Sequence, residues 1–313
     1  MLRRVVALIG LAVLIVSTMA ACGRTDVIRV ADRDCASARS LPGGDSTRTI
    51  VSGGQSREYL LHVPPGYDGS SRAPVVMLFH GLGGDPRSIV ETTRMEELAD
   101  RDGTLLVAPL ARGLVPRWDF GSPITDPRSD LAFVRDLVKE VRTEACVDAG
   151  RVYATGFSNG SVLTLALACD GTTKFAAYGA VSGPYPADAC TQAPPASLIY
   201  FHGLRDTVVP YDGAPTAIGP LPPVNEIMAG WAAHDFCPPA GATTTVAEHV
   251  RHFAWNGCAG GSAVEVYVAD NGGHRWPGGE PSSSRQASGA TTLEIDASSL
   301  IWKFFARHAA DGQ

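Results

Sequence analysis

The sequence lacks the features that mark nucleic-acid-binding proteins, zinc proteins and repeat proteins. Its formal net charge is −6 and its basic residues form no long run, so a phosphate backbone would find little electrostatic attraction. No CxxC pair or Cys/His group has the spacing of a zinc site. No segment repeats along the chain. These absences argue against a nucleic-acid partner and lead us to predict no metal site.

What the sequence does contain is the composition of an ordinary globular protein. Apolar residues make up 45% of the 313 residues and charged residues 19%, which lies well outside the range of disordered chains. This length suits one large domain or two small ones.

The first 21 residues have the layout of a signal peptide. Arg3 and Arg4 supply positive charge, residues 5–16 form an apolar run too short for a membrane span, and small residues follow. Met19-Ala20-Ala21-Cys22 is similar to a bacterial lipobox, in which the cysteine becomes the lipidated first residue. We therefore predict an exported lipoprotein, anchored through Cys22 to the outer face of the bacterial cell membrane. The alternative is an ordinary cleaved signal followed by an incidental cysteine.

The remaining cysteines are even in number, as expected for disulfides in an exported protein. They are Cys35, Cys146, Cys169, Cys190, Cys237 and Cys258. Six cysteines allow about fifteen pairings, so the sequence leaves the connectivity open. Cys237 and Cys258 bracket one variable stretch and are the single pair that we predict.

Strand-like and helix-like segments alternate through most of the chain. Residues 47–51 and 57–63 are predicted to form an antiparallel hairpin. Buried strands are expected at 75–79, 105–108, 151–155, 178–181, 198–201 and 264–268. Helices are expected at 95–100, 131–141, 162–168, 224–233 and 298–307. The alternation predicts an α/β domain with a mostly parallel sheet, an antiparallel hairpin at its front and helices on both faces.

The domain boundaries follow from this pattern. We expect residues 22–46 to form a polar tether and residues 47–313 to form the catalytic domain. The Pro/Gly-rich segments 210–223 and 277–290 are expected to be loops near the mouth of a site.

Gly156-Phe157-Ser158-Asn159-Gly160 matches the G-x-S-x-G pattern of a serine nucleophile. A predicted strand precedes it and a predicted helix follows, which is the strand-turn-helix setting that this motif requires. The flanking glycines remove the side chains that would collide in so sharp a turn. A serine that merely caps a helix is the alternative, but the context favours Ser158 as the nucleophile.

A serine hydroxyl needs a base to take its proton, and the base needs an acid to orient it. Asp206 follows the predicted strand 198–201, at the end of a strand where sites in α/β sheets gather. His274 follows the strand 264–268 after two glycines that let the loop turn. The order Ser, acid, His is that of the α/β-hydrolase fold. Asp270 is the best substitute for the acid, and a turn aspartate is the alternative role for Asp206.

Attack on an ester builds negative charge on the carbonyl oxygen, which two backbone N–H groups should meet. Asn159 supplies one of them, because it follows the nucleophile directly. The other is expected from the turn His80-Gly81-Leu82-Gly83-Gly84, at Leu82 or, failing that, at Gly81. A glycine-rich turn with no catalytic part is the alternative. This turn lacks the GK[ST] ending of a P-loop.

Three further residues are candidates for contact with substrate. Trp118 and Trp276 are aromatic residues near the expected mouth of the site, where they would line an acyl or aryl pocket. His80 is the third, although its place at the start of the HG turn also suits a structural hydrogen bond. Both tryptophans have the same structural alternative.

Four motifs together resemble a known family. They are HGLGG (80–84), GFSNG (156–160), HGLRDTVVPY (202–211) and GGHRWPG (272–278). In this order they are similar to the polyhydroxybutyrate depolymerases and feruloyl esterases, that is, carbohydrate esterase family 1 and its relatives. With the lipobox, the chain looks most like the lipoprotein esterases of actinobacteria.

The resemblance covers about residues 47 to 307. It implies an α/β-hydrolase fold, hydrolysis of carboxylic esters such as feruloyl, acetyl or short hydroxyalkanoate esters, and no cofactor. It places the nucleophile at Ser158, the acid at Asp206 and the base at His274. A separate substrate-binding domain is missing, which argues against attack on insoluble polymer.

Three other functions are compatible with the same scaffold. An acyltransferase of the cell envelope would pass the acyl group from the same triad to a sugar. A binding protein on an inactive hydrolase fold is a second possibility, although the complete triad argues against it. A protease is the third, because the triad alone does not choose between amide and ester. The sequence leaves the oligomeric state open.

Overall fold

The computed structural model describes residues 35, 40–121, 126, 129–190, 193–216, 219–238, 242–280 and 288–309. The predicted signal peptide and Cys22 lie outside the described residues, and so does most of the predicted tether. In the described part of the chain, no helix is both long and apolar enough to cross a bilayer.

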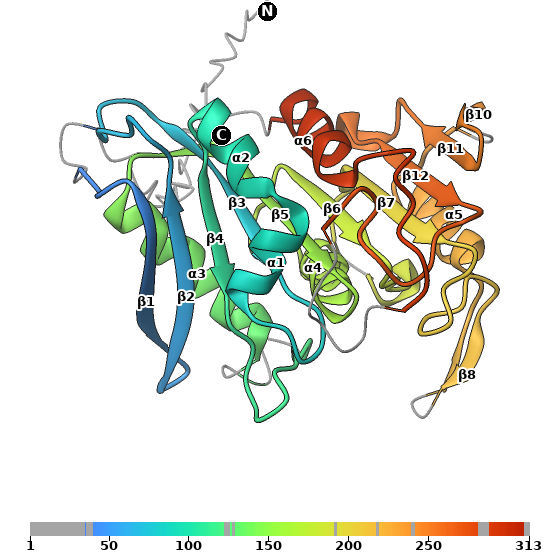
Figure 1. The fold of residues 1–313 in the computed structure, drawn as a ribbon, viewed down its shortest axis with the longest axis horizontal. Helices are drawn as coiled ribbons and strands as arrows, with labels where there is room; N and C mark the ends of the chain where they lie inside the picture. Colours follow the sequence, from blue (N-terminus) through green and yellow to red (C-terminus); the bar gives the residue numbers. More distant parts are fainter. Residues whose placement is uncertain are drawn as a thin grey trace, which may run out of the picture. The chain divides into compact units, whose positions relative to one another are not determined.

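One large sheet organises the described part of the chain (Figure 1). Its ten strands stand in the order β1 (Gly44–Ser52), β2 (Gln55–Val63), β4 (Leu105–Pro109), β3 (Ala73–Phe79), β5 (Val147–Phe157), β6 (Ala177–Val181), β7 (Leu198–Gly203), β12 (Val264–Ala269), β11 (Val250–Trp255) and β10 (Ala242–Ala247). A separate ribbon pairs β8 (Ala214–Thr216) with β9 (Gly219–Leu221).

The six strands from β4 to β12 run parallel to one another. Antiparallel pairs flank them, with β1 and β2 at one end and β11 and β10 at the other. Strand β3 lies between β4 and β5. After β3 the chain continues to β4 on one side, and after β5 it continues to β6 on the other side. Such a switch point opens a crevice at the carboxyl ends of the strands, which is where ligands bind in α/β sheets.

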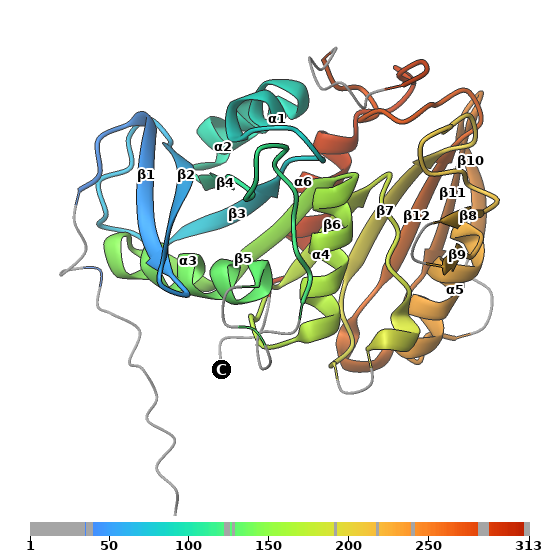
Figure 2. The ribbon, with the colours of Figure 1, turned by 90° about the horizontal axis from the view of Figure 1, so that it is seen from below.

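Helices cover both faces of the sheet (Figure 2). On one face lie α3 (Asp130–Glu144), α4 (Asn159–Asp170) and α5 (Val224–His234). On the other lie α1 (Pro86–Thr93), α2 (Met95–Asp102) and α6 (Ala297–Arg307). Strand β3 shows why both faces of the sheet need cover. Val75 and Met77 belong to one buried cluster, whereas Val76 and Leu78 belong to the other. Successive side chains of a strand face opposite ways, so an all-apolar strand needs cover on both sides.

The predicted fold class is confirmed, and the differences concern short or edge elements. Strands β10 and β11 were not predicted, because neither the Thr-rich edge strand Ala242–Ala247 nor its neighbour Val250–Trp255 shows the regular apolar alternation of a half-buried strand. The sequence analysis also missed α1, whose eight residues are too few for a clear helical period. The segment 210–223, expected to be a loop, contains the β8–β9 ribbon. Strand β1 begins at Gly44, three residues before the predicted domain start.

Three disulfides join the six cysteines. The predicted pair Cys237–Cys258 is confirmed. Cys169 pairs with Cys190, and Cys35 pairs with Cys146 just before β5. This last bond attaches a residue of the expected tether directly to the domain.

Candidate active site

Ser158 lies in a sharp turn between β5 and α4, in a backbone conformation that side-chain-bearing residues rarely adopt. Its φ is 53° and its ψ is −117°. The turn is possible only because its neighbours are glycines: a Cβ on Gly156 would lie 2.4 Å from the carbonyl oxygen of Gly160, and one on Gly160 would lie 2.3 Å from that of Phe79. Such strain persists where the surrounding structure holds it, often at functional sites. The N–H of Ser158 donates to the carbonyl of Val181 at 2.8 Å.

The structure brings the three predicted triad residues into one hydrogen-bonded chain. His274 Nε2 lies 2.9 Å from Ser158 Oγ, and His274 Nδ1 lies 2.7 Å from Asp206 Oδ2. All three side chains are buried. Since a carboxylate only accepts, His274 Nδ1–H donates to Asp206, which leaves Nε2 free to accept the serine proton. This is the arrangement that activates a serine hydroxyl.

Asp206 is held as an anion by its surroundings. Its other oxygen, Oδ1, accepts from the N–H groups of Val208 at 2.9 Å and Val209 at 2.8 Å. Burial alone would raise the pKa of the Asp206 carboxyl, but the hydrogen bond and charge at His274, the Val209 amide and His202 together lower it below its usual value. The alternative acid, Asp270, instead forms an ion pair with Arg251 at 3.0 Å.

His202, which opens an HG turn as His80 does and is predicted for that reason to make structural hydrogen bonds, supports this aspartate loop. Its Nε2–H donates to the carbonyl of Val209 at 2.8 Å and lies 3.5 Å from Asp206 Oδ2. Its Nδ1 accepts from the hydroxyl of Tyr200 at 2.8 Å. Burial lowers the pKa of His202 despite the charge of Asp206, so the ring is neutral.

Glycines let the loops that carry the acid and the base pack against each other. The N–H of Arg205 donates to the carbonyl of Gly272 at 2.9 Å. A Cβ on Gly203 would lie only 2.2 Å from that same oxygen. The His274 ring also packs against Phe157, with ring centroids 5.0 Å apart. The imidazole is therefore held from several sides in its position beside Ser158.

The predicted oxyanion-hole residues lie beside the nucleophile. A Cβ on Gly81 would lie 3.4 Å from Ser158 Cβ, so the glycine-rich turn after β3 contacts the serine. Asn159 is the first residue of α4, where backbone N–H groups lack an intrahelical partner. Within the described ranges, no backbone carbonyl accepts from the N–H of Leu82 or Asn159. The role of these two N–H groups in holding an oxyanion stays a prediction.

The other predicted contacts are buried beneath the site. Trp118 is fully buried and its indole N–H donates to the carbonyl of His80 at 2.7 Å. Trp276 is 2% exposed and donates to Ser298 Oγ at 3.0 Å. His80 Nδ1 lies 2.7 Å from the carbonyl of Gly81, and its Nε2 accepts from the N–H of Ala111. Burial lowers the pKa of His80. This burial favours the structural alternative for all three residues over contact with a substrate, because their polar atoms are satisfied within the protein.

Exposed apolar side chains instead lie at the rim of the site. Leu114 and Val115 are exposed, and Val115 lies 3.5 Å from the position of a Cβ on Gly83, in the glycine-rich turn after β3. Val208, beside Asp206, is also exposed. Sequence reasoning missed these residues because nothing in the local pattern of Leu114 and Val115 shows that they lie beside the glycine-rich turn.

Comparison with known proteins identifies an esterase family. The sequence model of the family described as "Esterase PHB depolymerase" matches residues 57–214, which include Ser158 and Asp206. "Putative esterase NocK" of Nocardia uniformis subsp. tsuyamanensis is 30% identical over 281 residues, which cover 81% of each chain. "Probable feruloyl esterase C" of Aspergillus terreus is 31% identical over 53% of this chain and 62% of its own length.

Solved structures share the fold. An acetyl xylan esterase from Aspergillus awamori superposes with a TM-score of 0.62 at 15% identity, covering 83% of this chain and 99% of its own. Thermogutta terrifontis esterase 2 superposes with a TM-score of 0.55 at 14% identity, covering 84% and 94%. At such low identity these similarities establish the α/β-hydrolase fold alone.

Proposed function

The chain belongs to the esterase PHB depolymerase family and is a carboxylic ester hydrolase, and we propose that it acts as a serine esterase through an acyl-enzyme on Ser158. The observation that carries this proposal is the continuous chain from Ser158 Oγ through the His274 ring to Asp206, with contacts of 2.9 and 2.7 Å. This geometry suits proton removal from the hydroxyl, because the base lies within hydrogen-bonding distance of it.

The proposed reaction has two halves. His274 Nε2 takes the proton as Ser158 Oγ attacks the ester carbonyl, while ionised Asp206 stabilises the imidazolium that forms. The N–H groups of Leu82 and Asn159 meet the oxyanion, each contributing about 100- to 1,000-fold in rate. The proton then passes to the departing alcohol. In the second half a water molecule, activated by the same imidazole, releases the acid and restores the serine.

We propose small or oligomeric feruloyl, acetyl or short hydroxyalkanoate esters as the substrate class. The names of the relatives support an ester of this kind. The apolar side chains of Leu114, Val115 and Val208 at the rim offer contact area to an acyl or aryl group. Truncating one of them should alter selectivity among acyl groups more than it alters the chemistry at Ser158.

We further propose that the protein is exported and anchored by lipid on Cys22. Three disulfides support export, because such bonds persist in oxidising compartments. Cell fractionation with a labelled fatty acid tests the anchor: wild-type protein should carry label in the membrane fraction, and Cys22→Ser should not. Label retained by the variant would contradict lipidation at this residue.

The decisive experiment for the reaction is a substrate panel. p-Nitrophenyl esters of increasing chain length, methyl ferulate and hydroxybutyrate oligomers are compared with wild-type and Ser158→Ala protein, and a fluorophosphonate tests labelling of Ser158. We expect labelling and turnover in wild type alone. A sugar acceptor added to the assay separates hydrolysis from acyl transfer: acylated sugar as the main product would overturn hydrolysis while leaving the triad in place.

A further inference from the structure

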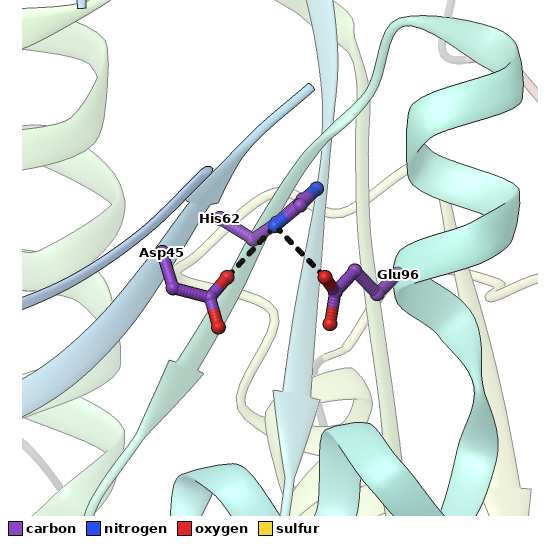
Figure 3. Close-up of side chains that lie close together, drawn as sticks. All are labelled: Asp45, His62 and Glu96. Atoms are coloured by element: carbon purple, nitrogen blue, oxygen red, sulfur yellow. Dashed lines mark hydrogen bonds and ion pairs between the residues drawn. The ribbon is translucent and has the colours of Figure 1, made fainter. Parts of the chain in front are cut away.

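A second histidine–carboxylate cluster, formed by Asp45, His62 and Glu96, lies between the first two strands and α2 (Figure 3). Asp45 of β1 and His62 of β2 are direct cross-strand partners, and Glu96 comes from α2. His62 in turn pairs with Leu106, near the start of β4. The triad lies at the carboxyl ends of the parallel strands, whereas this cluster lies near their amino ends.

Three potential ligand atoms face one another in this cluster. His62 Nδ1 lies 2.8 Å from Asp45 Oδ1 and 3.7 Å from Glu96 Oε1, and all three atoms lie within 4.8 Å of one another. A tetrahedral zinc ion with bonds of about 2.0–2.1 Å keeps its ligand atoms roughly 3.3 Å apart. The two separations from His62 Nδ1 lie on either side of that value, so the spacing of these ligand atoms is compatible with a bound metal ion.

The other side of the imidazole is oriented by a fourth residue. His62 Nε2 lies 2.8 Å from Asp100 Oδ1, and the ring is only 3% exposed. Because carboxylates only accept, Nδ1 donates to Asp45 and Nε2 donates to Asp100 in this structure, and a metal ion would take the place of the Nδ1 proton while Asp100 still accepts from Nε2–H. Metal-binding histidines are commonly held in this way, with the outer ring nitrogen bonded to a carboxylate. Arg87 orients Asp45 further through its second oxygen, at 3.0 Å.

The charge of the cluster favours a bound cation. Three carboxylates with one guanidinium leave the cluster negative, so a positive charge among them is favourable. A proton on His62 Nδ1 reaches Asp45, but Glu96 Oε1 at 3.7 Å is too far to accept it. A cation between the three atoms contacts both carboxylates at once.

We propose that Asp45, His62 and Glu96 bind a divalent transition-metal ion of the zinc type, with water completing its coordination. One imidazole and two carboxylates suit such an ion. The ion joins the first hairpin to α2, far from the hydrolytic chemistry, so its role is to stabilise the fold. The proposal is independent of the function proposed for Ser158.

The test uses mature, untagged protein freed of metal by EDTA and dialysis. Zinc chloride is titrated while bound metal is measured by elemental analysis and unfolding by calorimetry. We expect one equivalent of bound zinc and, at a hundredfold excess over Kd, a rise in Tm of roughly 5 °C or more. Ester hydrolysis should be the same with and without zinc.

Two matched variants of α2 make the test specific. Glu96→Gln removes a ligand and should weaken zinc binding at least tenfold. Glu97→Gln changes the adjacent exposed carboxylate, which is not one of the proposed ligands, and should bind zinc as wild type does. Equal binding by the two variants, or no zinc-dependent rise in Tm in wild type, would overturn the proposal and leave His62 as a protonated ion-pair partner.

Discussion

Two buried histidines can be compared, one near the carboxyl ends of the parallel strands and the other near their amino ends. His274 has a carboxylate at one ring nitrogen and a hydroxyl at the other, whereas His62 has carboxylates at both. Burial alone lowers the pKa of His62, but the hydrogen bonds to Asp100 and Asp45 and the charge of Glu96 outweigh burial and raise it. The group beside the second ring nitrogen, a hydroxyl for His274 and a carboxylate for His62, therefore decides what each histidine can do.

A hydroxyl brings its own proton, so the His274 ring remains an acceptor ready to take it. A pair of carboxylates brings only negative charge, so it favours a positive charge at His62, which either the proton of the imidazolium or a bound cation supplies. The first arrangement suits general-base catalysis and the second suits ion binding, although both begin from the same Asp–His pair.

The largest expected effect comes from removing the hydroxyl of Ser158. Ser158→Ala leaves His274 without a proton to take, and we expect kcat to fall by about 10⁶-fold while Tm stays close to that of wild type. Hydrolysis of p-nitrophenyl acetate together with calorimetry checks both statements. Substantial activity in the variant would show that another group is the nucleophile.

Removing the negative charge of Asp206, which lies beside Nδ1 of His274, has the next largest effect. Asp206→Asn cannot stabilise an imidazolium and favours the wrong tautomer of His274, so we expect kcat to fall by about 10⁴-fold. Asp270→Asn is the matched control, because Asp270 pairs with Arg251 and should leave kcat within a fewfold of wild type. If the two variants lost activity equally, the assignment of the acid would be wrong.

The equivalent change beside His62 should weaken ion binding and leave ester hydrolysis unchanged. Asp100→Asn weakens the orientation of His62, and we expect zinc affinity to fall by about 10- to 100-fold with no change in ester hydrolysis. Calorimetric titration and a kinetic assay on the same preparation measure the two effects. Loss of hydrolysis in this variant would contradict the separation of the two regions.

The smallest expected effect is on acid stability. The pKa of Asp206 is lower in the folded protein than its usual value, so its ionised form stabilises the fold. This contribution is present above the unfolded-state pKa and is lost as pH falls through the folded-state pKa. Urea unfolding across acidic pH should therefore show the stability difference between wild type and Asp206→Asn shrinking as pH falls. A difference independent of pH would argue that Asp206 is not held as an anion.

Much of the fold and the triad could be predicted from local sequence. Gly156 and Gly160 are required by collisions within a few residues, so the turn at Ser158 is visible in the motif itself. The parallel strands are apolar on both faces and stand out for that reason. The helix α1 and the strands β10 and β11 were missed because short or polar elements carry little periodic signal.

Contacts between distant segments were harder to predict. Trp118 and Trp276 stand near the site in sequence, yet their burial depends on which other segments pack over them. The zinc prediction shows the same limit. A search for closely spaced cysteines and histidines found no metal site, whereas the ligand set proposed above comes from two strands and a helix.

The sequence by itself determined the nucleophile turn, the order of the motifs and the fold class, because steric and hydrophobic demands of that kind act over neighbouring residues. Only the tertiary structure decided which tryptophans are buried, which loop borders Ser158, and that His62 stands among three carboxylates. Those facts depend on how segments remote in the chain pack together, and the burial and charge that they create exist only in the folded protein.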